Sequence, residues 1–150
     1  MRILFVCHGN ICRSSMAEFI MKDLVEKAGL SSQFEISSAA TSTEEIGNPV
    51  YPSARRKLAE HGIDCTGKTA RQLQNSDYEK YDLLIGMDQA NLRNMYRICG
   101  GDFRDRIHLL MEYTDRPGEV ADPWYTKDFD TAWCDIKEGC RCLLNLLVSE

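Results

Sequence analysis

The sequence predicts a single-domain α/β protein over residues 1–150, in which helices cover both faces of a four-stranded parallel sheet (a doubly wound arrangement). Short apolar segments alternate with amphipathic segments along the whole chain, and this alternation is typical of parallel strands joined by helices. A length of 150 residues fits one domain. No linker, internal repeat or low-complexity segment divides the chain.

Four segments have the short, apolar character of buried strands. The first, Arg2 to Val6, is rich in apolar and β-branched residues and carries one charge. The other strands are expected at residues 34–38, 82–87 and 106–110.

Apolar residues at helical spacing predict the helices between these strands. Met16, Ile20 and Leu24 mark one face of the first helix, which Gly29 ends. Ser15 and Glu18 have the spacing of a capping box at its start. Further helices are expected at residues 54–61, behind a cap at Asp88, and from residue 129 onward.

The composition narrows the class of protein. A net charge of −5 argues against nucleic-acid binding and against a polybasic membrane-surface protein. The amino-terminal segment reads as a buried strand rather than a signal peptide, and no apolar run reaches the roughly 18 residues of a membrane span. We therefore expect a cytoplasmic location, in which the seven cysteines are free thiols.

The residues with the clearest chemistry lie between the first strand and the first helix. They are Cys7, His8, Gly9, Asn10, Ile11, Cys12, Arg13 and Ser14. A loop at this place can direct its backbone N–H groups to one point, where the helix dipole adds positive potential. Arg13 adds a planar guanidinium that matches phosphate oxygens, and the same field stabilises a thiolate at Cys7. The segment therefore predicts a phosphoryl-transfer site with a cysteine nucleophile.

Other interpretations of this loop fit less well. A cysteine at the end of a strand is most often a small core residue. A zinc site is disfavoured, because Cys7 and Cys12 are separated by four residues and no second Cys/His pair has ligand spacing. A nucleotide-binding loop would end in Gly-Lys-Ser/Thr, which is absent. We expect neither a metal nor a cofactor.

Residues 7–14, followed by Met16-Ala17-Glu18, resemble the signature of the low-molecular-weight protein tyrosine phosphatase family. Further segments fall in family order at residues 38–42, 47–49, 61–63, 70–72, 87–88 and 122–124. The resemblance implies catalysis without a metal, by way of a phosphocysteine on Cys7. It also implies that Arg13 binds phosphate, Asn10 holds the loop, Ser14 hydrogen-bonds the thiolate, and Asp122 is the general acid and base.

The role of Asp122 also follows from the chemistry. A leaving alkoxide or phenolate needs a proton, which a carboxylic acid on a loop can deliver, and Pro123 stiffens that loop. Without the first loop, the Asp-Pro pair would be interpreted as a turn. Glu44, Trp124 and Tyr125 are expected to line the substrate cleft, although the two aromatic residues would also serve as packing residues.

The chain departs from the family pattern at two places. His8 stands where many members have a smaller or apolar residue, and it is either an exposed loop residue or a group that tunes the thiolate. Residues 67–69 replace a segment in which the family often has a histidine, so the support of Asn10 is expected to differ.

Three rival functions fit the sequence less well. Arsenate reductases of this scaffold need two further cysteines near the loop after the third strand, where only Cys99 occurs. Protein-arginine phosphatases tend to have threonine where this chain has Ile11, so Ile11 favours phosphotyrosine. A phosphate-binding module without catalysis would not need both Cys7 and Asp122.

The same reasoning predicts the partners and a redox response. Cys12 is expected to be a resolving thiol that protects Cys7 after oxidation, the alternative being that it only packs under the loop. Phosphotyrosine proteins are the expected partners, phosphate and other oxyanions the expected ligands, and a tyrosine kinase a further candidate. We expect no nucleic acid, no membrane, and a monomer or weak dimer.

Overall fold

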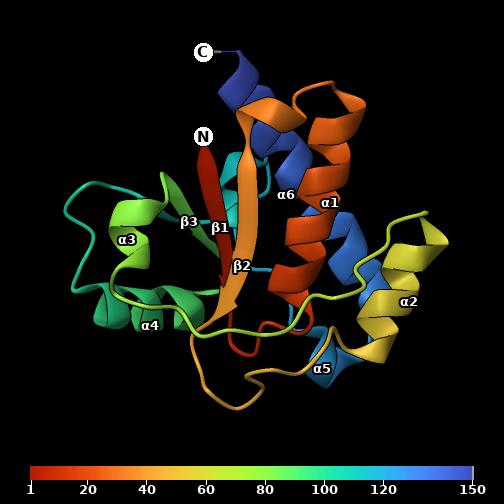
Figure 1. Cartoon of the computed structure of the whole chain (residues 1–150), viewed down its shortest axis with the longest axis horizontal. Coiled ribbons are helices and arrows are strands. Elements are labelled where there is room, and N and C mark those ends of the chain that lie inside the picture. The colour runs from red at the N-terminus through yellow and green to blue at the C-terminus, as the bar shows by residue number, and fades with distance from the viewer. Residues whose placement is uncertain (150) are drawn as a thin grey trace.

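The four strands form one parallel sheet in the order β2-β1-β3-β4 (Figure 1). The fold is taken from a computed structural model, which describes residues 1–149. The strands are β1 (Arg2–Cys7), β2 (Glu35–Ala40), β3 (Leu83–Gly86) and β4 (Ile107–Leu109). The predicted fold class is therefore confirmed, with each strand boundary within two residues of its expected place.

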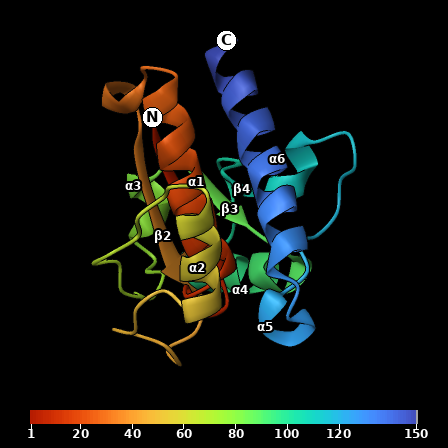
Figure 2. The same ribbon diagram turned by 90° about the vertical axis from the view of Figure 1, so that its right-hand side faces the viewer.

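Helices cover both faces of this sheet, as predicted (Figures 1 and 2). On one face lie α1 (Arg13–Lys27), α2 (Pro52–Glu60) and α6 (Phe129–Val148), and on the other lie α3 (Asp77–Lys80) and α4 (Gln89–Cys99). The short α5 (Pro123–Thr126) and the 3₁₀ turns η1 (Ser31–Gln33) and η2 (Leu110–Tyr113) complete the described elements. Neither α3 nor α5 was predicted from the sequence.

The alternation of side chains along β1 divides the core in two. Ile3, Phe5 and Cys7 pack on the α1 and α6 side, whereas Leu4 and Val6 pack against α3 and α4. All five are buried, as expected of a central parallel strand. Cys7 therefore ends β1 at the carboxyl edge of the sheet, directly beneath the start of α1.

The two capping predictions had opposite outcomes. Asp88 caps α4, because its Oδ1 accepts from the backbone N–H of Asn91 at 2.7 Å while the Asn91 side chain accepts from the N–H of Asp88 at 3.3 Å. The capping box at Ser15 and Glu18 was wrong. The first helix begins earlier, at Arg13, and both side chains are buried and bound to groups outside it.

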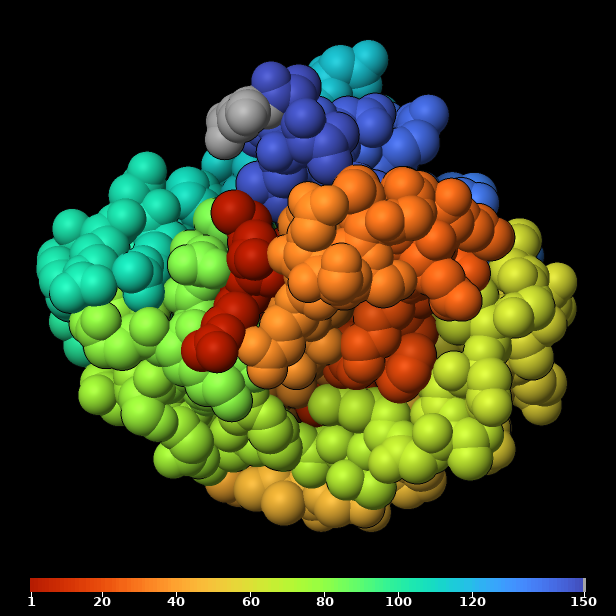
Figure 3. Space-filling model, turned by 45° about the horizontal axis from the view of Figure 1, so that its top comes forward, coloured from red at the N-terminus to blue at the C-terminus, as the bar shows by residue number. Residues whose placement is uncertain are grey.

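The amino terminus and the end of α6 lie at the amino ends of the strands, the end that Figure 3 brings forward. The carboxyl ends of the strands, and the loops that follow them, form the opposite end of the molecule (Figure 1). Within residues 1–149, no helix combines the length and the apolar character that crossing a membrane requires.

Candidate active site

Three donors converge on the sulfur of Cys7. The hydroxyl of Ser14 lies 2.9 Å from Sγ, and the backbone N–H groups of Asn10 and Ser14 lie 3.3 Å and 3.4 Å from it. The residue is only 4% exposed. Donors directed at a buried sulfur stabilise its negatively charged form, which is the nucleophilic form of cysteine.

The carbonyl groups of the loop are turned away from its centre, because donors outside the loop bind them. Thr41 N–H binds the carbonyl of Cys7, Ser42 N–H that of His8, Ser15 Oγ that of Asn10 and Tyr51 N–H that of Ile11, at 2.7–3.0 Å. Within residues 1–149, the N–H groups of Gly9, Ile11 and Cys12 have no protein acceptor. The loop therefore presents donors to its centre at the start of α1, which is the geometry of an anion cradle.

Asn10 holds this loop in shape with both its backbone and its side chain. Its φ of +61° is in the left-handed region, which asparagine tolerates better than most residues. Its Nδ2 donates to Ser14 Oγ at 2.8 Å and to Ser38 Oγ at 2.9 Å, and its Oδ1 accepts from Arg71 N–H at 3.2 Å. Because Ser14 Oγ already accepts from Asn10, its own proton is free to point at the sulfur of Cys7.

A buried charged pair stands behind Asn10. The hydroxyl of Ser38 donates to Glu18 Oε1 at 2.5 Å, and Lys68 Nζ donates to the carbonyl of Ser38 at 3.0 Å while lying 3.5 Å from the same carboxylate oxygen. Burial lowers the pKa of Lys68, and the charge of Glu18 opposes that shift. Lys68 thus stands in the segment where the sequence departs from the family pattern, and it supports Asn10 through Ser38.

Arg13 links three segments of the chain. Its Nη1 donates to Asp88 Oδ2 at 2.8 Å and to the carbonyl of Val120 at 2.9 Å, while Nη2 lies 3.4 Å from Asp122 Oδ2. Burial alone would lower the pKa of Arg13, but the negative charges of Cys7, Asp88 and Asp122 outweigh it and raise that pKa. Asp88 was foreseen only as a helix cap, and its contact with Arg13 was missed.

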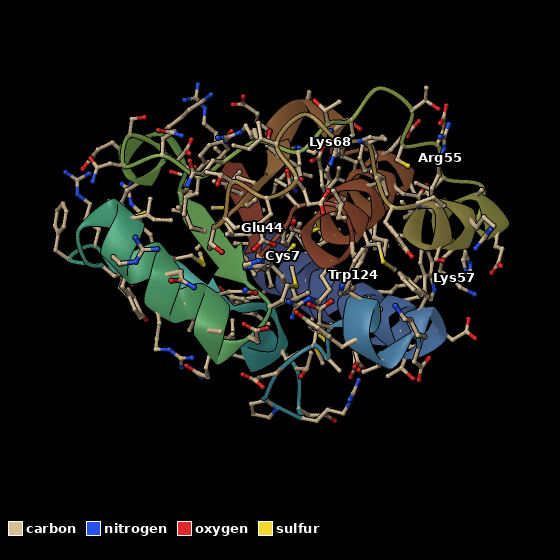
Figure 4. The ribbon with its side chains drawn as sticks, turned by 90° about the horizontal axis from the view of Figure 1, so that it is seen from below. Cys7, Glu44, Arg55, Lys57, Lys68 and Trp124 are labelled. Atoms are coloured by element: carbon tan, nitrogen blue, oxygen red, sulfur yellow. The ribbon has the colours of Figure 1, made fainter. Side chains whose placement is uncertain are left out.

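Asp122 and the expected wall residues line the same pocket as the loop. Asp122 caps α5 by accepting from the N–H of Trp124 at 3.0 Å. The pocket has a volume of about 110 Å³ and is bordered by Glu44, Trp124 and Tyr125, together with Glu45, which the sequence analysis did not single out. In Figure 4, Cys7 lies between Glu44 on one side and Trp124 on the other.

His8 stands at the rim of this pocket, paired with Glu44. Its Nε2 lies 3.0 Å from Glu44 Oε2, and both side chains are more than half exposed. His8 therefore makes an exposed contact with Glu44, and a role in tuning the thiolate stays a prediction.

Cys12 is buried beside the cradle. Burial is the main cause that raises its pKa to about 12, and the charge of Cys7 adds to the rise. Both cysteines are free thiols here, as are the other five.

The family model described as low molecular weight phosphotyrosine protein phosphatase matches residues 2–150. The chain belongs to this family. The rival arsenate-reductase interpretation has no support in this match, and the resemblance noted from residues 7–14 is confirmed over nearly the whole chain.

Individual proteins similar to this chain are named as phosphatases of the same family. The chain is 37% identical over 150 residues to low molecular weight protein-tyrosine-phosphatase YfkJ of Bacillus subtilis, covering 99% of this chain and 96% of that protein. The crystal structure of YfkJ matches with a TM-score of 0.96 at 36% identity, over 99% of this chain and 95% of that one. The low molecular weight phosphotyrosine protein phosphatase of Gallus gallus is 37% identical over 147 residues, 95% of this chain and 92% of that protein.

The same scaffold is also that of a Drosophila arginine phosphatase. Its crystal structure matches with a TM-score of 0.89 at 28% identity, over 98% of each chain.

Lys68 and Lys22 both pair with Glu18, and replacing each in turn tests whether Lys68 supports the Cys7 loop. The Lys68 side chain is 13% exposed and that of Lys22 is 44% exposed. Removing one partner of a buried pair is far costlier than removing an exposed one. We expect Lys68→Met to lower the free energy of unfolding by about 2–3 kcal/mol, and Lys22→Met by less than about 1 kcal/mol. Urea unfolding measures both.

The same two variants also test whether Lys68 keeps the loop around Cys7 in the conformation that makes the thiol reactive. Alkylation of Cys7 by iodoacetate at neutral pH should slow in Lys68→Met, because a displaced Ser38 releases Asn10 from its place. It should stay near the wild-type rate in Lys22→Met. Equal effects of the two substitutions on stability and on alkylation would contradict the supporting role of Lys68.

Proposed function

We propose that this protein hydrolyses phosphotyrosine in protein substrates through a phosphocysteine intermediate on Cys7. The observation that carries the proposal is the convergence of three donors on a buried cysteine sulfur at the floor of an anion cradle. Arg13 and Asp122 border the same pocket. Family membership supports the same activity.

In the first step, the backbone N–H groups and Arg13 bind the non-bridging oxygens of the phosphate. The thiolate of Cys7 attacks phosphorus, so that an S–P bond forms while the bond to the tyrosyl oxygen breaks. Asp122 donates its proton to that oxygen, and the product leaves as a neutral phenol. A phosphate dianion bound to Arg13 takes the place of the contact between Arg13 and Asp122, which leaves the carboxyl group of Asp122 available to the leaving oxygen.

In the second step, water attacks the phosphocysteine. Asp122, now a carboxylate, accepts a proton from that water while the S–P bond breaks and its electron pair returns to Cys7. The hydroxyl of Ser14 and the N–H groups of Asn10 and Ser14 stabilise the departing thiolate. Inorganic phosphate is the product.

An aryl substrate suits the walls of the pocket. Trp124 and Tyr125 are 40% and 80% exposed, so their rings are available to stack on a phenyl group. Ile11, the residue that favours phosphotyrosine over phosphoarginine, lines the same pocket. We expect a higher kcat/KM on phosphotyrosine peptides than on matched phosphoarginine peptides, and the reverse order would overturn this specificity.

The site of action and the partners remain predictions. We propose that the protein works in the cytoplasm, where its seven free thiols would stay reduced. Phosphotyrosine proteins are its proposed substrates.

The nucleophile is tested by two substitutions. Cys7→Ser should abolish hydrolysis of an aryl phosphate while retaining vanadate binding, because the cradle and Arg13 remain. Arg13→Lys keeps the charge but loses the planar fork, so it should weaken both turnover and vanadate affinity. Substantial turnover by Cys7→Ser would contradict the mechanism. Activity that a strong chelator removes and added metal restores would count equally against it.

The general acid is tested by varying the leaving group. Asp122→Asn should slow phenyl phosphate hydrolysis by about 10²- to 10⁴-fold, the usual contribution of general-acid catalysis. The loss should shrink for esters whose leaving groups are already stable anions. A loss that is the same across leaving groups of very different pKa would show that Asp122 does not protonate them.

We also propose that Cys12 protects Cys7 from irreversible oxidation. A thiolate at Cys7 is the form that peroxide converts to sulfenic acid. Part of the rise in the pKa of Cys12 comes from the charge of Cys7, and that charge disappears when Cys7 becomes a neutral sulfenic acid. Oxidation of Cys7 therefore makes the Cys12 thiolate easier to form. That thiolate attacks the sulfenic sulfur of Cys7, so that an S–S bond forms while the S–O bond breaks, and the oxygen leaves as hydroxide, which takes up a proton to become water.

Peroxide should inactivate the wild-type enzyme, and a dithiol should restore it. Mass spectrometry of the oxidised protein should show a bridge between Cys7 and Cys12. Cys12→Ser should recover poorly, while Cys134→Ser, on an exposed cysteine, should recover like wild type. Full recovery of Cys12→Ser, or a bridge to another cysteine, would reject Cys12 as the protecting thiol.

A further inference from the structure

A second hollow continues the phosphate pocket toward α2. This flanking groove has a volume of about 470 Å³, against about 110 Å³ for the pocket itself. The two share Ile11, Glu45 and Trp124 as common walls. A substrate whose phosphate lies over Cys7 therefore has a second hollow directly beside it.

The wall of the flanking groove is rigidly tied to the catalytic loop. Tyr51 packs edge-on against Trp124 with 4.9 Å between ring centroids and stacks on Phe129 at 6.1 Å. Its backbone N–H binds the carbonyl of Ile11 at 2.9 Å. Trp124 is 40% exposed, so the groove offers an apolar floor whose position is set before any ligand arrives.

Two arginines of α2 form the far end of the flanking groove. Arg55 and Arg56 are both exposed and line it, and within residues 1–149 neither makes an ion pair. Arg55 is near enough to Asp64 for its charge to help lower the pKa of that carboxyl, after the larger effect of the hydrogen bonds from Thr66. Arg56 donates only to the hydroxyl of Ser53, at 3.2 Å.

The next residue of α2, Lys57, differs from the two arginines because it makes ion pairs. Lys57 pairs with Glu60 at 2.7 Å and also with Asp130 at the start of α6, which fixes the helix in place. Figure 4 shows Arg55 and Lys57 on α2, on the side of Trp124 away from Glu44. In a chain with a net charge of −5, two exposed arginines that make no ion pair within residues 1–149 and lie beside the phosphate pocket indicate a site for a second negative group.

Charge is thus distributed unequally around the phosphate pocket. Glu44 borders the phosphate pocket outside the flanking groove, Glu45 is a wall of both hollows, and Arg55 and Arg56 line the flanking groove only. An acidic side chain of a bound peptide is repelled near Glu44 and Glu45 and attracted at the end of the flanking groove formed by Arg55 and Arg56. The orientation of a peptide in the site is therefore set by the sign of the residues that flank the phosphorylated one.

We propose that the flanking groove binds the segment next to the phosphotyrosine in acidic protein substrates, with an apolar side chain on Tyr51 and Trp124 and a carboxylate at Arg55 and Arg56. The proposal rests on the proposed function, because it assigns the phosphotyrosine to the pocket over Cys7. An extended peptide advances about 3.3 Å per residue, so the carboxylate belongs to a residue a few positions from the phosphotyrosine. This acidic residue lies on one side of the phosphotyrosine only, either before it or after it in the peptide.

The test uses pairs of phosphotyrosine peptides that differ by Glu or Gln at a single position, from one to four residues before or after the phosphotyrosine. We expect the Glu peptide to have about a threefold to tenfold higher kcat/KM than its Gln partner at one or two positions on one side. No such gain should occur on the other side. The ratio should fall as salt is raised.

The variant Arg55→Gln/Arg56→Gln should bring this ratio close to one. Arg93→Gln is the matched control, because Arg93 is an exposed arginine on α4 outside both hollows, and it should keep the wild-type ratio. Loss of the ratio in Arg93→Gln as well would show a bulk charge effect. A ratio near one in wild type, or one retained in the double variant, would overturn the proposal.

Binding separates this proposal from the proposed function. Fluorescence anisotropy of the same labelled peptides on Cys7→Ser reports the Glu preference without any turnover. If the wild-type protein does not hydrolyse an aryl phosphate but the Glu preference in binding persists, the proposed function is refuted and the proposal for the groove is not. Binding of anionic lipid vesicles that depends on Arg55 and Arg56, with no Glu preference among peptides, would identify a membrane surface as the occupant and reject the peptide.

Discussion

The left-handed backbone at Asn10 is the constraint on which the site depends. With a φ of +61°, the chain reverses within the loop, so that the N–H groups of Asn10 and Ser14 both reach the sulfur of Cys7. A non-glycine residue in this region is uncommon, but asparagine can compensate through its short polar side chain. Here both N–H groups of the amide are bound, to Ser14 and to Ser38, and the amide oxygen is bound as well. The buried pair of Glu18 and Lys68 then fixes Ser38 from behind.

A second set of contacts, centred on Arg13, orients the charged groups before a substrate binds. The strand order places the end of β3 beside the end of β1, and Asp88, which follows β3, therefore reaches Arg13. The same guanidinium binds the carbonyl of Val120, two residues before Asp122. One buried cation thus sets the distance between the nucleophile and the acid loop. Groups arranged in this way need little reorganisation during reaction, which is the main source of electrostatic catalysis.

Local signals in the sequence were enough to predict the strands, most of the helices and the loop, because each of these depends on neighbours in the chain. The apolar run before Cys7 predicts a buried strand, and the position of residues 7–13 between that strand and a helix start predicts a cradle. The partners supplied by distant segments were not predictable in this way. Asp88 binds Arg13 across 75 residues, and Lys68 reaches Ser38 across 30. The wrong capping box has the same cause, since Glu18 has local helix-start spacing but is bound by Ser38 across the α1–β2 contact.

The central claim is that the phosphoryl group passes through the sulfur of Cys7, and trapping that intermediate tests it most directly. Wild-type protein would be mixed with excess aryl phosphate and stopped within milliseconds by denaturant at alkaline pH, where a phosphorus–sulfur bond survives. Peptide mass spectrometry should then find one phosphoryl group on Cys7, in an amount that matches the initial burst of phenol. A burst with the phosphoryl group on another residue, or steady turnover with none on Cys7 at any time, would contradict the account.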